Sequence, residues 1–325
     1  MRALFVMVAM VMAACSQPST QTSYRQSPSP TAAASVCSLP VWWPDDIGVR
    51  AAFVSVPDGA VTDVGVLPPP PEVAGVLPGG FGGATYVSGT RTWLRVDGHN
   101  LAPDGKRYVY WTGTPTESEL RLVDVASGAG RVIYSGPNMY VPLSFESDVI
   151  YLRHAVNPKQ GGFENLYRLD PSGGTPALVP GTDSGQVSWV LISDGAAWGV
   201  AARVNLTSVV RLDLATSQIT EWFAGPMNEL VWPLGTDTKH RLYVQGLKQN
   251  VLWRVETSGQ ADQLANPGPI GPSASWGGSY SFIADARGVW IKSQGSVWLY
   301  PDAGVPKKFV VGRSNEDVWP AGPCL

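Results

Sequence analysis

Two series of acidic residues recur along the chain with one common period. Members of the first series precede a strand-like run with an apolar centre; they are Asp104, Asp148, Asp194, Asp237 and Asp285. Members of the second series close the next strand-like run; they are Asp124, Asp170, Asp213, Glu256 and Asp302. Neighbours within each series lie 43 to 48 residues apart. Two independent series with the same period indicate a tandem structural repeat. We call these ten residues the marker acids.

The repeat is clearest over residues 101–134. This stretch holds three strand-like runs, 108–112, 119–125 and 131–134, separated by Pro-Asp-Gly and Ala-Ser-Gly turns. A period of roughly 40–50 residues with four short strands per unit is characteristic of a β-propeller blade. We therefore expect an all-β chain that forms a single β-propeller. Five clear repeats and one shared blade predict six four-stranded blades, with five or seven as alternatives, in a ring closed by the N- and C-terminal strands.

The composition agrees with short strands and tight turns, because the chain holds 13 Trp, 11 Tyr, 36 Gly and 28 Pro. The formal net charge is −3. A nucleic-acid partner normally requires a basic surface, so this mild acidity argues against one.

The N-terminus has the pattern of an export signal. Residues 3–14 form an apolar run of twelve after Arg2, which is too short to cross a bilayer. The run ends in Met12-Ala13-Ala14-Cys15, which resembles the bacterial lipobox. We expect residues 1–14 to be a lipoprotein signal peptide and Cys15 to carry lipid. The alternative is an ordinary cleaved signal with an unpaired Cys15. Lipidation predicts a membrane-anchored protein of the bacterial cell envelope that faces outside the cytoplasm.

Residues 15–35 are predicted to form a disordered tether, because Tyr24 is the sole core-forming residue after Cys15 in this Ser/Pro/Thr/Gln-rich segment. Such a tether reaches about 25 Å. Residues 36–325 form the predicted propeller domain. Within it, residues 49–66 read as a hairpin of the shared blade, and residues 37–43 or 317–324 supply that blade's inner strand. Residues 92–96 are predicted to be the inner strand of the second blade. The Pro/Gly-rich loop 67–83 is a surface excursion or a lid.

Cys37 and Cys324 are the two thiols that remain if Cys15 carries lipid. Export permits a disulfide, and ring closure would bring the two ends of the domain together. We therefore predict a Cys37–Cys324 bond, with two unpaired buried thiols as the alternative.

The segment 101–111, LAPDGKRYVYW, followed by LRLVDVASG, resembles the TolB-like, WD40-like (PD40-type) repeat. In this chain Ala102 replaces the Ser of the repeat's Ser-Pro-Asp-Gly-Lys core. The resemblance implies a propeller and no catalytic residues, because members of that family mostly bind proteins or small ligands. The order of lipoprotein signal, tether and propeller also resembles that of other bacterial lipoproteins.

Motif searches give no support for a cofactor, a metal or a catalytic residue. The marker acids are interpreted as caps of their own turns. The three histidines lack the spacing of a metal site, and neither a nucleophile elbow nor a nucleotide-binding glycine motif occurs. Gly288-Val289-Trp290 and Ser296-Val297-Trp298 resemble motifs of streptogramin-lyase propellers, whose chemistry uses a histidine base. His154 is the histidine in a loop on the face away from the marker acids. The alternative function is therefore a lyase or glycan-active enzyme acting around His154.

Variable loops on the face opposite the marker acids are the predicted binding surface, since binding residues concentrate on loops of rigid scaffolds. The candidates are His154, Lys159, Asp183, Asn228, Glu229, Arg313, Asn315 and Asp317. We favour a monomeric, non-enzymatic binding or scaffold module for a protein or small ligand. The sequence names neither that ligand nor its physiological process.

Overall fold

The computed structural model describes residues 36–45, 48–68, 83–114, 117–157, 162–183, 185–203, 206–264, 282–311 and 316–325. The chain divides into two units, residues 1–34 and 35–325, and all described residues belong to the second. The predicted signal peptide, Cys15, the tether and residues 69–82 of the Pro/Gly loop lie outside the described residues.

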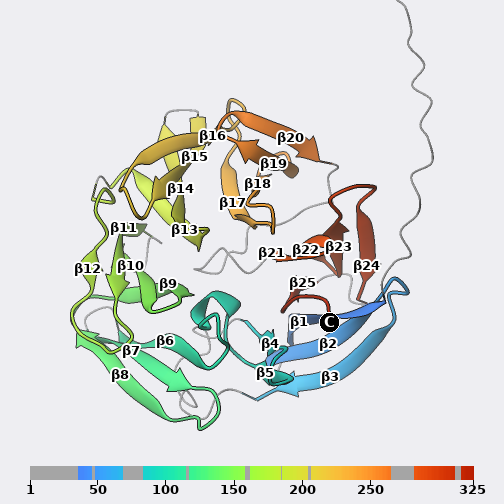
Figure 1. The fold of residues 1–325 in the computed structure, drawn as a ribbon, viewed down its shortest axis with the longest axis horizontal. Helices are drawn as coiled ribbons and strands as arrows, with labels where there is room; N and C mark the ends of the chain where they lie inside the picture. Colours follow the sequence, from blue (N-terminus) through green and yellow to red (C-terminus); the bar gives the residue numbers. More distant parts are fainter. Residues whose placement is uncertain are drawn as a thin grey trace, which may run out of the picture. The chain divides into compact units, whose positions relative to one another are not determined.

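Three sheets of the described chain each hold four antiparallel strands in sequential order. The first contains β9 (Tyr140–Glu146), β10 (Val149–Asn157), β11 (Gly162–Leu169) and β12 (Ala177–Leu178). The second contains β13 (Val187–Ser193), β14 (Ala196–Arg203), β15 (Leu206–Asp213) and β16 (Ile219–Ala224). The third contains β17 (Val231–Thr236), β18 (Leu242–Gly246), β19 (Val251–Thr257) and β20 (Gln260–Leu264). Figure 1 shows these sheets side by side around a centre, with the first strand of each innermost.

The two ends of the domain meet in one continuous sheet. Its later part contains β21 (Phe282–Asp285), β22 (Gly288–Gln294), β23 (Ser296–Tyr300), β24 (Lys307–Val310) and β25 (Asp317–Pro320). Its early part contains β1 (Cys37–Asp45), β2 (Gly48–Val56) and β3 (Val61–Leu67). β25 pairs with β1 through Trp42 and Trp319 and with β22 through Ser293 and Val318. The predicted closure by terminal strands is therefore confirmed, with β25 next to β1.

The predicted disulfide is also present. Cys37 and Cys324 are bonded, with their Cα atoms 5.6 Å apart. Trp42 and Trp319 stack beside the closure, with ring centroids 4.4 Å apart.

The stretch with the clearest repeat forms a three-stranded sheet of β6 (Arg107–Thr114), β7 (Glu117–Asp124) and β8 (Gly130–Gly136). Each strand coincides with one of the three runs expected from the sequence, although β7 ends at Asp124, one residue before the expected end. The innermost position is taken by Leu101, which bridges to Tyr108. The prediction that residues 92–96 form this inner strand is wrong.

Residues 92–94 instead form β5 (Thr92–Leu94), which pairs with β4 (Thr85–Val87). Aromatic packing explains the difference. Tyr86 and Trp93 contact each other and Phe53 of β2, with ring centroids 5.1 to 5.6 Å apart. Edge-to-face packing of this kind is favourable beyond simple burial of area. In addition, the Tyr86 backbone N–H donates to the Ala321 carbonyl at 2.8 Å. These contacts hold the β4–β5 hairpin beside the terminal closure.

The hydrophobic core lies in layers between successive sheets. One layer joins Val109 and Leu120 of the β6–β8 sheet to Phe145, Ile150 and Leu152 of the next. Equivalent buried clusters follow at each later sheet boundary, and one joins Trp290 of β22 to Leu39 of β1. Inner strands such as β18 and β22 therefore bury almost all their residues, which accounts for the dense aliphatic and aromatic content of those runs. Outer strands such as β3 and β20 are largely exposed.

The succession of sheets around a centre, their inner-to-outer strand order and the terminal closure define a β-propeller. The predicted fold class is confirmed. The count of six blades stays a prediction.

Six of the marker acids cap their own turns. Asp124 accepts hydrogen bonds from the Ser127 N–H at 2.9 Å and its hydroxyl at 2.8 Å. Asp213 accepts the equivalent bonds from Thr216 at 2.9 and 3.0 Å. Backbone N–H groups also donate to Asp104, Asp170, Asp237 and Asp285. The interpretation of these six acids as turn caps is confirmed.

Candidate functional site

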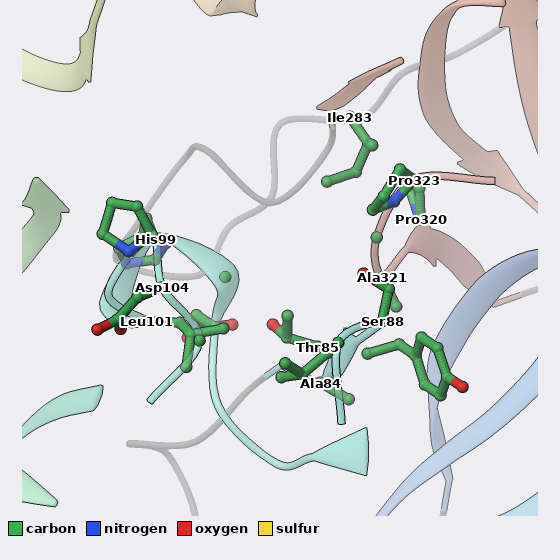
Figure 2. A pocket seen from close by; sticks show the side chains of 18 of the residues that line it. Ala84, Thr85, Ser88, His99, Leu101, Asp104, Ile283, Pro320, Ala321 and Pro323 are labelled. Carbon is green, nitrogen blue, oxygen red and sulfur yellow. The ribbon is translucent and has the colours of Figure 1, made fainter. Parts of the chain in front are cut away.

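A cavity of about 1330 Å³ lies at the centre of the described sheets. Its walls come from β4 and the turn after it, the 3₁₀ helix η2 (Gly98–Asn100), turns 103–106 and 124–126, and segment 320–323. The remaining wall comes from the last residues of β13, β17 and β21. Figure 2 shows His99, Leu101 and Asp104 on one side and Ile283 and Pro320 on the other.

The cavity lies at the marker-acid end of the inner strands. Ser193, Thr236 and Ala284 line it, and each immediately precedes a marker acid. Asp104 and Asp124 are themselves in the lining. Binding was expected on the opposite face, so this cavity adds a second candidate surface.

Most of the lining side chains are apolar or carry a single hydroxyl group. The apolar ones include Trp42, Leu191, Leu234, Phe282 and Ile283. The hydroxyl groups belong to Thr85, Ser88, Thr90, Thr92, Ser193 and Thr236, and Tyr86 adds a phenol. Small-molecule sites have this character, with apolar walls and a few polar groups that fix the ligand's orientation.

His99 reaches the cavity because a short 3₁₀ turn interrupts the chain between β5 and β6. The Asn100 N–H donates to the Asp97 carbonyl at 2.9 Å, and the Leu101 N–H donates to the Gly98 carbonyl at 3.2 Å. Burial, aided by the positive charge of Arg153, lowers the pKa of His99 to about 3. The imidazole is therefore neutral at physiological pH, and one ring nitrogen donates while the other accepts.

Two contacts hold the segment before His99 in place. The Thr85 hydroxyl donates to the Val96 carbonyl at 2.7 Å. Gly83 approaches Asp97 so closely that a Cβ there would lie 1.7 Å from Asp97 Oδ1. Asp97 is 8% exposed and lines the cavity. A side chain at position 83 would therefore displace the carboxylate that forms part of the wall.

The rim carries the exposed charges of the cavity. Asp104, Lys106 and Asp124 are all exposed and line it. The Val125 N–H donates to the Lys106 carbonyl at 2.8 Å, which joins their two turns. The hydrogen bonds from Ser127 lower the pKa of Asp124 below its usual value. Asp124 is therefore ionised at neutral pH.

The sequence-predicted candidates that the structure describes lie apart from the cavity lining. Asp183 and Asn228 are exposed, and Asn228 has a positive φ of 65°. Three candidates, Lys159, Arg313 and Asn315, lie outside the described residues. The opposite-face binding surface stays a prediction.

Glu229 has a structural environment. Glu229 is only 2% exposed. Its Oε1 accepts hydrogen bonds from the Lys248 N–H at 2.7 Å and from the Gln249 N–H at 3.3 Å. The Glu229 carbonyl accepts a bond from the Thr207 hydroxyl at 2.7 Å. Glu229 therefore ties neighbouring loops of the opposite face together.

Asp317 is bound to Lys292 beside the terminal closure. The Lys292 Nζ donates to Asp317 Oδ2 at 2.8 Å and lies 5.0 Å from the centre of the Trp319 ring. Lys292 is fully buried. A buried ammonium requires such a partner, so the Asp317 carboxylate stabilises β25 against β22.

His154 belongs to an aromatic cluster at the end of β10. Its ring centroid lies 5.4 Å from that of Tyr140 and 6.0 Å from that of Tyr167. Tyr140 also contacts Tyr134 at 5.1 Å. Burial is the main cause that raises the pKa of Tyr140, so its phenol keeps its proton at neutral pH.

The described residues contain no group of three or more His, Cys, Asp or Glu side chains that could hold a metal ion. Sequence reasoning singled out neither His99 nor the cavity. The available signal was the loop sequence Gly98-His99-Asn100, which follows the predicted strand 92–96 and precedes the clearest repeat.

No family model matches the sequence, and no curated protein matches it significantly. Solved structures do match. A structure from work on two prolyl endopeptidases is 12% identical and has a TM-score of 0.51; the match covers 86% of this chain and 42% of that one. The chain has the propeller fold found in such structures. It spans less than half the length of that endopeptidase chain, and the likeness concerns the fold alone.

Two further matches have lower TM-scores. One is a putative TolB from Agrobacterium tumefaciens, with 12% identity, coverage of 89% of this chain and 94% of that chain, and a TM-score of 0.49. The other is an inactive virginiamycin B lyase from Staphylococcus aureus with quinupristin, with 14% identity, coverage of 87% and 94%, and a TM-score of 0.42.

Proposed function

We propose that this chain is a non-enzymatic binding propeller that acts outside the cytoplasm and holds its ligand in the central cavity. The observation that carries the proposal is the cavity itself. A volume of about 1330 Å³ accepts a drug-sized molecule or a short chain segment, and much of its lining is apolar. The neutral His99 ring forms part of the cavity wall.

The location rests on two features. The Cys37–Cys324 disulfide supports an oxidising compartment, because disulfides persist mainly outside the cytoplasm. The lipobox-like Met12–Cys15 segment supports attachment to a membrane through acyl chains on Cys15. In the described part of the chain, no helix is long and apolar enough to cross a membrane.

The alternative function is a lyase or glycan-active enzyme with His154 as the base. The ring contacts of His154 with Tyr140 and Tyr167 favour a packing role for this imidazole. The large cavity lies at the other end of the inner strands, so we prefer the binding function.

The test uses a variant that adds a large side chain to the lining of the cavity. Gly89 lines the cavity, a Cβ there would meet nothing within 4 Å, and its φ is outside the left-handed region. Gly89→Trp therefore adds a large ring without a clash at the backbone. Met227→Trp is the matched control, because Met227 is 78% exposed on a loop of the opposite face.

Binding is followed with N-phenyl-1-naphthylamine, a neutral apolar dye whose fluorescence rises in a dry site. We expect saturable binding to the wild type and to Met227→Trp, and at least a tenfold weaker affinity for Gly89→Trp. Absence of saturable binding to the wild type contradicts the proposal. Loss of binding in Met227→Trp alone would instead place the site on the opposite face.

A further inference from the structure

Negatively charged side chains outnumber positively charged ones in the lining of the cavity. Three carboxylates, Asp97, Asp104 and Asp124, line it, whereas Lys106 is the one Lys or Arg among its described lining residues. His99 adds no charge near neutral pH, because burial lowers its pKa. The electrostatic potential of the described lining therefore favours cations.

We propose that the cavity selects an apolar ligand that carries a positive charge, with its apolar body inside and its cation at the rim beside Asp104 and Asp124. This inference rests on the proposed function, since it names the ligand class for the same cavity.

The two rim carboxylates can accept a cation without losing their structural role. Both bonds from Ser127 go to Oδ1 of Asp124, and the Lys106 N–H donates to Oδ1 of Asp104 at 2.9 Å. A carboxylate has two oxygens with about four acceptor positions. Each Oδ2 thus has lone pairs for an ammonium or guanidinium group while Oδ1 keeps the turn closed.

The orientation of the ligand in the cavity follows from the positive charge of Arg153, which lies deeper in the protein. Arg153 is 3% exposed, donates to the Trp189 carbonyl at 3.5 Å, and its positive charge acts on His99. A ligand cation placed next to His99 would be repelled by this guanidinium and would also lose its water. At the rim the cation keeps part of its hydration and faces two carboxylates, Asp104 and Asp124, against the single ammonium of Lys106. The apolar body then contacts Phe282 and Leu234 of the cavity wall.

The expected size of the charge effect is moderate. Asp104 and Asp124 are exposed, so water and salt screen their attraction. Exposed ion pairs contribute about two- to fivefold each to an equilibrium constant. When a cationic and an anionic ligand share one ring system, the cation is attracted and the anion is repelled. We therefore expect the ratio of their affinities to exceed the effect of a single ion pair.

Two fluorescent dyes with the same xanthene rings and opposite charge test the inference. Rhodamine 6G is a cation, and sulforhodamine B is a net anion. Fluorescence anisotropy at about 50 mM salt should show rhodamine 6G bound at least tenfold more tightly, and higher salt should narrow the difference. Gly89→Trp should abolish binding of rhodamine 6G.

Asp124→Asn removes the charge and keeps an oxygen that can cap the turn. Asp213→Asn is its matched control, because Asp213 caps an equivalent turn through Thr216 but is not part of the cavity lining. We expect Asp124→Asn to weaken the affinity for rhodamine 6G two- to fivefold. Asp213→Asn should leave this affinity unchanged.

The outcomes separate this inference from the proposed function. Equal affinity for the two dyes, or an equal effect of Asp124→Asn and Asp213→Asn, overturns the inference about charge. If the neutral dye still binds the wild type and not Gly89→Trp, the cavity remains the binding site. If neither rhodamine nor the neutral dye binds the wild type, both proposals are wrong.

Discussion

Cys37 and Cys324 are bonded although 287 residues separate them in the sequence. Backbone pairing accompanies the bond. The Ser38 N–H donates to the Leu325 carbonyl at 3.2 Å, and the Leu325 N–H donates to the Ser38 carbonyl at 3.0 Å. Asp285 adds a further contact, because its carboxylate accepts the Cys324 N–H at 3.0 Å. The ring is therefore closed by one covalent bond and by hydrogen bonds around it.

Replacing Cys37 and Cys324 by serine should lower the free energy of unfolding by about 2–5 kcal/mol. The bond restricts the unfolded chain over almost the whole domain, whereas β25 still pairs with β1 without it. We expect the double variant to fold and to bind N-phenyl-1-naphthylamine. Denaturant unfolding of oxidised wild type, reduced wild type and the double variant measures the effect. Equal midpoints for all three would contradict this role.

Arg241 connects two neighbouring sheets. Arg241 is 8% exposed, and its Nε donates to Asp237 at 2.7 Å. Its guanidinium also donates a hydrogen bond to Asp302, which follows β23 in the neighbouring sheet. Burial opposes the charge, but the bonds to Asp237 and Asp302 raise the pKa of Arg241 above its usual value. Arg241→Met should therefore destabilise the fold by about 3 kcal/mol, because it leaves the buried Asp237 carboxylate unpaired.

Arg254→Met is the control for this change. Arg254 bonds Asp262 at 2.9 Å, and the Asp262 side chain is 61% exposed. Exposed ion pairs contribute about 1 kcal/mol or less. If the denaturant midpoints of the two variants shift equally, the ion pairs of Arg241 contribute no more to stability than an exposed surface ion pair.

The repeat was readable from the sequence because the turn chemistry is local. Asp124 and Asp213 each bond a Ser or Thr three residues later, so the signal recurs wherever the turn recurs. The inner strand runs are readable as well, since strands such as β18 and β22 are buried along almost their whole length and are largely apolar. The terminal disulfide followed from export and from the need to close the ring.

The cavity was not readable, because its residues converge only in three dimensions. Leu191, Leu234 and Ile283 come from three different sheets and carry no shared motif beyond being apolar. His99 lies in a turn whose position depends on the aromatic packing of Tyr86 and Trp93. Such packing sets where a segment goes without leaving a periodic pattern.

Loop polarity alone does not distinguish residues with a structural partner from residues that face solvent. Glu229 and Asp317 were selected as polar loop positions, yet one caps buried backbone and the other pairs with a buried lysine. A carboxylate with a structural partner and one that faces solvent look the same in a sequence. Asp183 is exposed, so its substitution remains a test of binding on the face opposite the marker acids.

Cys15→Ser should release the protein from the membrane fraction. Attachment is predicted to depend on acyl chains on Cys15, and the rest of residues 1–35 has no second strongly apolar run after the signal. Fractionation of cells that express wild type and variant measures the effect. Cys324→Ser, which spares Cys15, should stay in the membrane fraction. Equal fractionation of wild type and Cys15→Ser would contradict lipid anchoring.

The pH dependence of stability should report the burial of His99. Burial and Arg153 lower the pKa of His99 from 6.5 to about 3 in the folded chain. Above pH 6.5 the ring is neutral in both the folded and unfolded states and adds no dependence on pH. As the pH falls from 6.5 towards 3, the unfolded chain takes up a proton that the folded chain does not. Stability therefore falls over this window, by at most about 1.4 kcal/mol per pH unit for one proton.

His99→Gln removes this titration and should flatten the decline between pH 6.5 and 4 relative to wild type. The carboxylates titrate in both proteins, so the difference between the two curves isolates His99. His240→Gln is the control, because the His240 side chain is 74% exposed. Urea unfolding at half-unit pH steps gives the curves. Parallel curves for wild type and His99→Gln would mean that His99 titrates in the folded chain as it does in the unfolded chain, with a pKa near 6.5, and is not held neutral below that pH by burial.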